Sequence, residues 1–191
     1  MSECNVTKRE IPSEMDVEHL RLIRENVTRF VARVGRQYAG LPGRLLDVAP
    51  QVHEGARPHF GPQVLIETLD LDPSANCTFT ADLCRTNEDL IPAGTYDYIV
   101  CTEVLEHTLQ PFQAAAELYR MLRPGGCLFL TVPFNFRIHG PLPDCWRFTE
   151  HGLRALLSDF ELIELEALET PERPLMPIHY AVVARKPAGV A

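Results

Sequence analysis

The sequence of 191 residues lacks several features that mark common classes of protein. No apolar run approaches the roughly 18–20 residues of a membrane-spanning helix, and the charged N-terminal stretch has no apolar core of the kind found in secretion signals. The six cysteines include no CxxC pair and no cluster with histidines at short spacing, which argues against a structural zinc site. We therefore expect a cytoplasmic protein, with no membrane partner, whose cysteines are reduced.

Positive charge and glycine are also in short supply. The chain carries 18 Lys and Arg against 26 Asp and Glu, a formal net charge of −8, which makes nucleic acid an unfavourable partner. No Gly-x-Gly-x-x-Gly fingerprint is present among its 11 glycines, and this disfavours a nucleotide-dependent oxidoreductase. The remaining composition, 46% hydrophobic and 23% charged, is typical of a globular domain with one core.

The order of periodic segments predicts the fold class. Apolar residues recur every three or four positions from residue 16 until a Gly-Leu-Pro-Gly stop, which predicts a long N-terminal helix. Short, largely apolar segments that predict strands are 44–49, 64–71, 77–81, 96–102, 126–132, 160–169 and 178–186. Further helices are expected at 111–122 and 149–158. The sequence therefore predicts an α/β domain: a Rossmann-like, doubly wound, mostly parallel seven-stranded sheet with an antiparallel C-terminal hairpin.

Acidic residues follow several of the predicted strands. Open α/β sheets bind ligands at the carboxyl ends of their strands, where the strand order reverses. Asp70 ends the second strand, 23 residues after Asp47, and its two oxygens could accept hydrogen bonds from both hydroxyls of an adenosine ribose. Asp82 could accept from the adenine amino group. The alternative is that these acids cap helices; capping is favoured for Asp72, which precedes Pro73, and ligand binding for Asp70.

Five segments in order then resemble a known family: LLDVAP, ETLDLDP, ADLC, YDYIVCTEVLEHTLQP and ELYRMLRPGGCLFLTVP. They are similar to the class I S-adenosylmethionine-dependent methyltransferases of the compact small-molecule type (methyltransferase type 11-like), over about residues 44–165. The resemblance implies a domain at 44–186, preceded by an extension and helix at 1–43 and followed by a tail at 187–191. It also implies S-adenosylmethionine as cofactor, contacted by Asp47, Ala49, Gln51, His53, Asp70, Leu71, Asp82, Leu83, Thr102 and Glu103.

The first loop departs from the family pattern. Family members usually have Gly-x-Gly-x-Gly after Asp-Val, whereas Ala49, Gln51 and His53 hold the three glycine positions here, with Pro50 between the first two. Two interpretations remain open. Gln51 and His53 could contact the methionine carboxylate or the substrate, or the site could have lost its cofactor; the first is favoured because the other elements are intact.

The resemblance implies in-line methyl transfer to a small polar acceptor, sugar-like or from secondary metabolism. The alternative is a catalytically altered binding module or partner subunit. A homodimer is compatible with the sequence. His107 and His139 are the candidate bases, and a structural role is equally open for His107.

A long segment, 133–148, is expected to form a lid or substrate wall because it is rich in aromatic residues and prolines. Its candidate substrate contacts are Phe134, Phe136, Arg137, Trp146 and Arg147. No metal is the favoured expectation. A less favoured alternative is a metal site, because carboxylates and imidazoles suit a divalent ion; its ligands would be Glu103, Glu106, His107 and His139.

Overall fold

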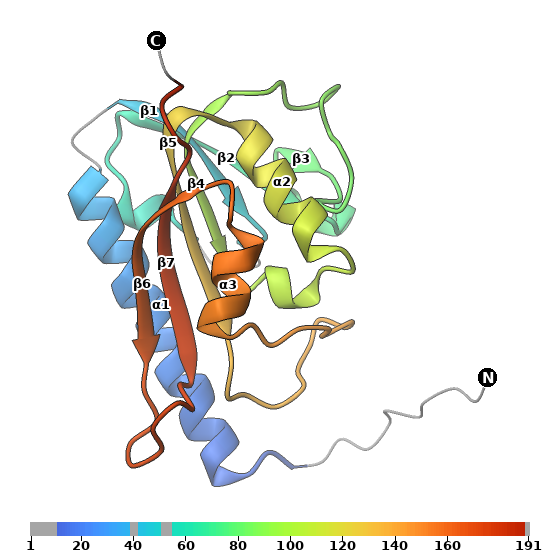
Figure 1. Ribbon diagram of the computed structural model, residues 1–191. Helices are drawn as coiled ribbons and strands as arrows, with labels where there is room; N and C mark the ends of the chain where they lie inside the picture. Colours follow the sequence, from blue (N-terminus) through green and yellow to red (C-terminus); the bar gives the residue numbers. More distant parts are fainter. Residues whose placement is uncertain (1–10, 39–41, 51–54, 190–191) are drawn as a thin grey trace.

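One mixed sheet organises the protein (Figure 1). The computed structural model describes residues 11–38, 42–50 and 55–189, so the predicted contacts Gln51 and His53 lie outside the described residues. The strands are β1 (Gly43–Val48), β2 (Val64–Asp70), β3 (Phe79–Thr80), β4 (Tyr96–Thr102), β5 (Leu122–Pro133), β6 (Glu161–Leu168) and β7 (His179–Arg185). The helices are α1 (Glu14–Tyr38), α2 (Pro111–Met121) and α3 (Glu150–Leu156), with 3₁₀ turns η1 (Arg57–His59), η2 (Pro73–Ala75) and η3 (Leu105–His107).

The strand order is β3-β2-β1-β4-β5-β7-β6. Strands β1 to β5 pair in parallel, and β7 runs antiparallel to both β5 and β6. The predicted mostly parallel sheet of seven strands and its antiparallel C-terminal hairpin are thereby confirmed. The order reverses between β1 and β4, so the carboxyl ends of these strands and of β2 mark the place where a ligand is expected.

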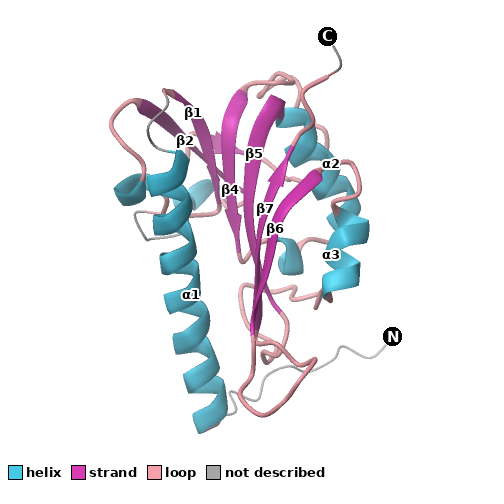
Figure 2. Ribbon diagram, turned by 60° about the vertical axis from the view of Figure 1, so that its left-hand side comes forward, coloured by secondary structure: helices cyan, strands magenta, loops and turns pink. Residues whose placement is uncertain are grey.

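Both faces of the sheet are apolar because side chains alternate along each buried strand. In β5, Leu128 and Leu130 pack in the core that contains α2 and α3, whereas Cys127 and Phe129 pack in the core that contains α1. Figure 2 shows α1 on one face of the sheet and α2 and α3 on the opposite face. Burial of one large apolar side chain, such as that of Phe129, contributes about 2–3 kcal/mol to stability. Because a slip of one residue would move every side chain of a strand to the other face, this alternation fixes the register of the central strands.

The connections among the first four strands differ from the usual doubly wound arrangement, in which helices link the parallel strands. The described residues that connect β1 to β2, β2 to β3 and β3 to β4 form loops, turns and the 3₁₀ segments η1 and η2, with no α-helix among them, and α1 packs against one face of the sheet. The connection from β2 to β3 is too short for an α-helix of average length. It is instead organised by Asp72, whose Oδ1 accepts a hydrogen bond from Ser74 N at 2.8 Å, which confirms the predicted capping role.

After β5 the chain passes through the 133–148 segment before it enters α3. The backbone N–H groups of Cys145 and Trp146 both donate to the carbonyl oxygen of Glu106, at 2.7 and 3.1 Å. The indole Nε1 of Trp146 donates to Thr108 O at 2.7 Å. These bonds fix the segment across η3, at the carboxyl end of β4. Among the described helices, none combines the length and the apolar character needed to span a bilayer.

Candidate functional site

A pocket of about 1100 Å³ lies at the carboxyl ends of β1, β2 and β4, as the topology predicts. It is lined by seven of the residues that the sequence analysis selected: Ala49, Asp70, Leu71, Asp82, Leu83, Glu103 and His107. The described residues selected there that do not line it are Asp47, Thr102, Glu106, Phe134, Phe136, Arg137, His139, Trp146 and Arg147. The pocket is therefore built mainly from the predicted cofactor side.

Ala49 adopts the backbone conformation that its position requires. Its φ is +50°, in the left-handed region, and its N–H donates to Leu69 O at 2.7 Å. A non-glycine residue there carries a cost of roughly 1–2 kcal/mol. The first of the three glycine positions thus keeps the glycine-like conformation without glycine.

Asp47 supports the loop beyond β1. Its carboxylate is almost fully buried, and Oδ2 accepts a hydrogen bond from Ala56 N at 2.7 Å. Burial raises the pKa of Asp47 to about 6, although the bond from Ala56 opposes that shift. Gly55 has a φ of +58°, and a Cβ at this position would lie 2.2 Å from Oδ2 of Asp47. Glycine at position 55 is therefore needed for this contact.

The two acids on the β2 and β3 side are only partly engaged by the protein. Oδ1 of Asp70 accepts from Asp72 N at 2.9 Å, and Oδ1 of Asp82 accepts from Cys84 N at 2.8 Å. Oδ2 of Asp82 lies 3.6 Å from the guanidinium of Arg85, and no described residue donates a hydrogen bond to Oδ2 of Asp70. One carboxylate oxygen of Asp70 is thus available to a ligand in the pocket.

Glu103 has a different environment on the β4 side. Its Oε1 accepts hydrogen bonds from Thr131 Oγ1 at 2.9 Å and from His179 Nε2 at 2.7 Å. The ring of His179 is fully buried, and its Nδ1 lies 2.9 Å from the side-chain amide nitrogen of Asn26 on α1. Nδ1 must accept there, so Nε2 carries the proton that it donates to Glu103. Sequence reasoning missed His179, because only sheet pairing places β7 next to β5, one strand away from β4.

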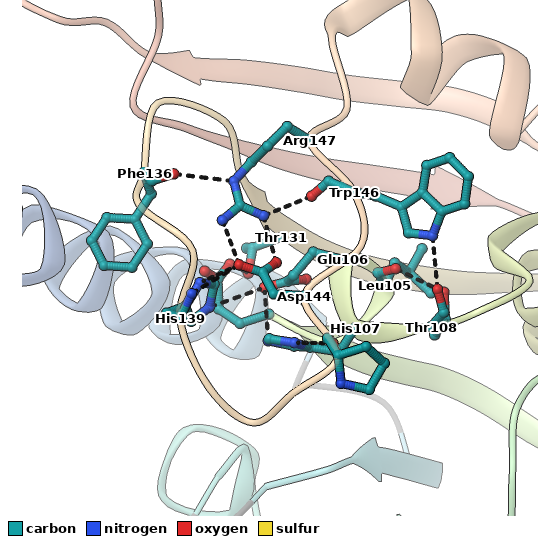
Figure 3. Close-up of polar contacts among 12 residues, drawn as sticks. Leu105, Glu106, His107, Thr108, Thr131, Phe136, His139, Asp144, Trp146 and Arg147 are labelled. Atoms are coloured by element: carbon teal, nitrogen blue, oxygen red, sulfur yellow. Dashed lines mark hydrogen bonds and ion pairs between the residues drawn. The ribbon is translucent and has the colours of Figure 1, made fainter. Parts of the chain in front are cut away.

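Glu106 is the most unusual acid in the structure. Its side chain is fully buried, and neither carboxylate oxygen has a hydrogen-bond partner among the described residues. Oε1 lies 3.7 Å from His107 Nε2 and 3.9 Å from His139 Nε2. Figure 3 shows the two rings on the same side of the Glu106 carboxylate. Burial raises the pKa of Glu106 well above its usual value, and the nearby Glu103 adds to that shift. Burial also lowers the pKa of His139, although Asp144 opposes this shift.

The second nitrogen of each ring is held by the 133–148 segment. His107 Nδ1 donates to Pro143 O at 3.0 Å. His139 Nδ1 lies 3.1 Å from Oδ2 of Asp144, which also accepts from the backbone N–H of His139 at 2.9 Å. Both Nε2 atoms are consequently turned toward Glu106.

Arg147 fastens the same segment. Its guanidinium donates two hydrogen bonds to the carboxylate of Asp144, at 2.6 and 2.7 Å. Its other three N–H groups donate to backbone carbonyl oxygens of Phe136, Arg137 and Trp146. All five donors are occupied, so a substrate contact from Arg147 would have to replace one of these bonds.

The other predicted substrate contacts have neighbours inside the protein. The Phe134 ring packs edge-on against Tyr180, that of Phe136 against His139, and Trp146 stacks on Phe148. A contact of 3.5 Å joins Arg137 to Asp16 at the start of α1. The segment instead lines the pocket with Pro141, Leu142 and Pro143, which the sequence analysis did not select.

The comparisons with known proteins agree with this geometry. Residues 16–168 match the family model described as "Methyltransferase domain". A ubiquinone biosynthesis O-methyltransferase of Xanthomonas oryzae pv. oryzae is 29% identical over 108 residues, which are 56% of this chain and 38% of that protein. This chain thus aligns with well under half of the length of that relative.

Two solved structures illustrate the shared fold. The 1,6-didemethyltoxoflavin N1-methyltransferase of Burkholderia thailandensis, with 1,6-didemethyltoxoflavin and S-adenosylhomocysteine bound, is 18% identical, with a TM-score of 0.59 and 93% of each chain covered. The [4+2]-cyclase SpnF is 17% identical, with a TM-score of 0.64 and 83% of this chain and 80% of that chain covered. At such identities the likeness shows the fold alone, and a cyclase among these structures means that the fold does not determine the reaction.

Proposed function

This chain belongs to the class I S-adenosylmethionine-dependent methyltransferases, and on that premise we propose that it methylates an oxygen atom of a small polar molecule bound in the pocket. The observation that carries the proposal is the pocket itself. Its volume of about 1100 Å³ exceeds what most single small ligands occupy, so a cofactor and a small acceptor fit together.

The residues present fit the cofactor at its nucleoside end. Asp70 would accept hydrogen bonds from the ribose hydroxyls, since its Oδ2 has no donor among the described residues. Asp82 would accept from the adenine amino group, with Leu71 and Leu83 against the ring. Ala49, with its φ of +50°, allows the chain to turn beside the ligand as glycine would.

When bound, the cofactor supplies an electrophilic methyl group on a sulfonium. The contribution of the chain is to align the acceptor, an effect that can lower a barrier by up to ~7–11 kcal/mol. Glu103 and Val104 at the end of β4, together with Leu142 of the 133–148 segment, line the part of the pocket where we place the acceptor. The apolar side chains among them would keep water away from the reacting atoms.

Oxygen is proposed as the acceptor atom because the curated relative is an O-methyltransferase. A sugar-like or secondary-metabolite acceptor is compatible with a pocket lined by both acids and apolar residues. His107 also lines the pocket, but its Nε2 is turned to Glu106, so we do not assign it as the base.

Calorimetry with S-adenosylmethionine and S-adenosylhomocysteine tests the proposal. We expect the wild-type protein to bind both, and Asp70→Ala to weaken binding at least tenfold because two ribose hydroxyls lose their acceptor. Asp89→Ala is the matched control: Asp89 is exposed and lies outside the pocket, so affinity should not change. Wild-type affinity in Asp70→Ala would contradict the placement of the ribose.

Turnover is tested separately with a panel of hydroxylated acceptors and with methyl transfer from labelled cofactor as the readout. Product formation with an oxygen acceptor supports the proposal. Cofactor binding without transfer to any acceptor class would favour the alternative, a methyltransferase-like binding module. Absence of heat with both ligands would remove the proposed function altogether.

A further inference from the structure

Three atoms with lone pairs face one another beside the pocket. The Nδ1–H of His107 donates a hydrogen bond to Pro143 O, so in the neutral ring Nε2 is unprotonated and carries a lone pair. His139 Nδ1 lies between Asp144 Oδ2 at 3.1 Å and Arg137 O at 3.3 Å, two acceptors, so this ring also presents an unprotonated Nε2. Both lone pairs point toward the carboxylate of Glu106 (Figure 3).

The carboxylate of Glu106 makes no hydrogen bond to either histidine. The separations of 3.7 and 3.9 Å from Glu106 Oε1 to the two Nε2 atoms are too long for hydrogen bonds. Neither oxygen of Glu106 has another partner among the described residues, although the side chain is fully buried. A buried carboxylate without a partner is costly, so its retention needs an explanation.

The separations suit a shared cation. The three ligand atoms lie within 4.8 Å of one another. Ligand atoms bound at ~2.1 Å to a common ion lie about 3–3.5 Å apart. An ion would therefore shorten the separations between these ligand atoms by a few tenths of an ångström up to about 1.8 Å, which small side-chain rotations can supply.

The surroundings of the cluster resemble those of known metal ligands. A metal-bound histidine usually donates its other ring N–H to a carboxylate or a backbone carbonyl, which fixes its tautomer. Both kinds of acceptor occur here: Nδ1 of His139 faces the carboxylate of Asp144, and Nδ1 of His107 donates to the carbonyl oxygen of Pro143. Asp144 is in turn held by two bonds from Arg147. The imidazoles are thus oriented before any ion arrives.

We propose that Glu106, His107 and His139 form a binding site for one divalent transition-metal ion at the edge of the pocket. Two imidazoles and one carboxylate suit Zn²⁺, Mn²⁺, Fe²⁺ or Co²⁺ rather than Mg²⁺ or Ca²⁺, which prefer oxygen ligands. Three protein ligands leave positions open to water or, if the proposed function holds, to the acceptor oxygen. Glu103, a fourth ligand in the metal alternative drawn from the sequence, lies outside this cluster, and its Oε1 accepts hydrogen bonds from Thr131 and His179 instead.

The test is titration of tag-free, chelator-treated protein with Co²⁺, followed by visible absorption and calorimetry. We expect one equivalent to bind, with d–d bands of nitrogen and oxygen coordination and no thiolate charge-transfer band. His139→Ala and Glu106→Gln should each weaken Co²⁺ binding at least 100-fold. His151→Ala, which removes an exposed histidine on α3, is the matched control and should bind as the wild type does.

Unaltered Co²⁺ affinity in both cluster variants would overturn the proposal, as would a thiolate band or no binding by the wild type. Folding is checked in each variant by calorimetry with S-adenosylhomocysteine, so loss of the metal site is distinguished from failure of the proposed function.

Thermal unfolding without metal provides a second, independent readout. If Glu106 is a metal ligand, its buried charge destabilises the metal-free protein, so Glu106→Gln should unfold at the same or a higher temperature than the metal-free wild type. Co²⁺ should raise the unfolding temperature of the wild type only. A lower unfolding temperature for Glu106→Gln, with no effect of Co²⁺ on the wild type, would mean that Glu106 serves only as an internal ion-pair partner.

Discussion

The two sides of the pocket use acidic residues in opposite ways. On the β2 and β3 side, Asp70 and Asp82 are partly exposed at or just after the strand ends, and one oxygen of each accepts a hydrogen bond from a backbone N–H two residues further along the chain. On the β4 side, Glu106 and Asp144 have fully buried carboxylates. Water solvates the charges of Asp70 and Asp82, whereas the buried carboxylates of Glu106 and Asp144 must be protonated, paired with an arginine or bound to a metal ion.

The difference shows that an acidic residue can bind a ligand in one place and orient neighbouring side chains in another. An exposed acid at a strand end remains available to a neutral ligand with hydroxyl or amino groups. A buried acid organises the groups around it, as Asp144 does with Arg147 and His139. The following variants test this contrast, in order of decreasing expected effect.

Arg147→Met should have the largest effect on stability. It leaves the buried carboxylate of Asp144 without its two-bond partner, and we expect the free energy of unfolding to fall by about 3 kcal/mol. Urea unfolding measures this. The control Arg154→Met breaks an ion pair with Glu150 in which both side chains are about half exposed, and it should change stability by less than about 0.5 kcal/mol. Equal losses in the two variants would show that burial is not the deciding factor.

Asp47→Asn should have a smaller, pH-dependent effect. Because the pKa of Asp47 is raised to about 6 in the folded protein, against about 3.9 in an unfolded chain, the acid destabilises the fold once both states are ionised. The penalty is absent below about pH 4, grows between pH 4 and 6, and is complete above 6. Asparagine retains an acceptor for Ala56 N, so the variant should be about 2 kcal/mol more stable than the wild type at pH 7.5.

Urea unfolding of Asp47→Asn and the wild type at pH 7.5 and at pH 4 checks this sign. The advantage of the variant should shrink toward zero at the lower pH. A variant that is less stable than the wild type at pH 7.5 would show that the charge on Asp47 stabilises the loop beyond β1.

Asp82→Ala should have the smallest effect, and only on cofactor affinity. A single hydrogen bond from an adenine amino group to a partly exposed carboxylate is worth about 1 kcal/mol, which corresponds to roughly fivefold weaker binding of S-adenosylhomocysteine. Calorimetry measures it. A loss larger than that of Asp70→Ala would reverse the assignment of ribose and adenine to these two acids.

Much of the pocket could be predicted because its cofactor side consists of residues that directly follow strands. Asp70, Asp82 and Glu103 each come at or just after the end of β2, β3 or β4, and the parallel sheet brings those ends to one edge. The substrate side could not be predicted in the same way. Within the 133–148 segment the arginine, tryptophan and phenylalanine side chains make internal contacts, and the prolines and Leu142 line the pocket instead.

The sequence by itself determined the order and type of the elements, since apolar periodicity and the prolines and glycines between segments are local properties. It also determined the family, through motifs that lie within single segments. Only the tertiary structure decided which polar groups meet. His139 reaches Glu106, and His179 reaches Glu103, across 33 and 76 positions of the chain. Such contacts depend on how strands pair and loops fold back, and no local pattern encodes them.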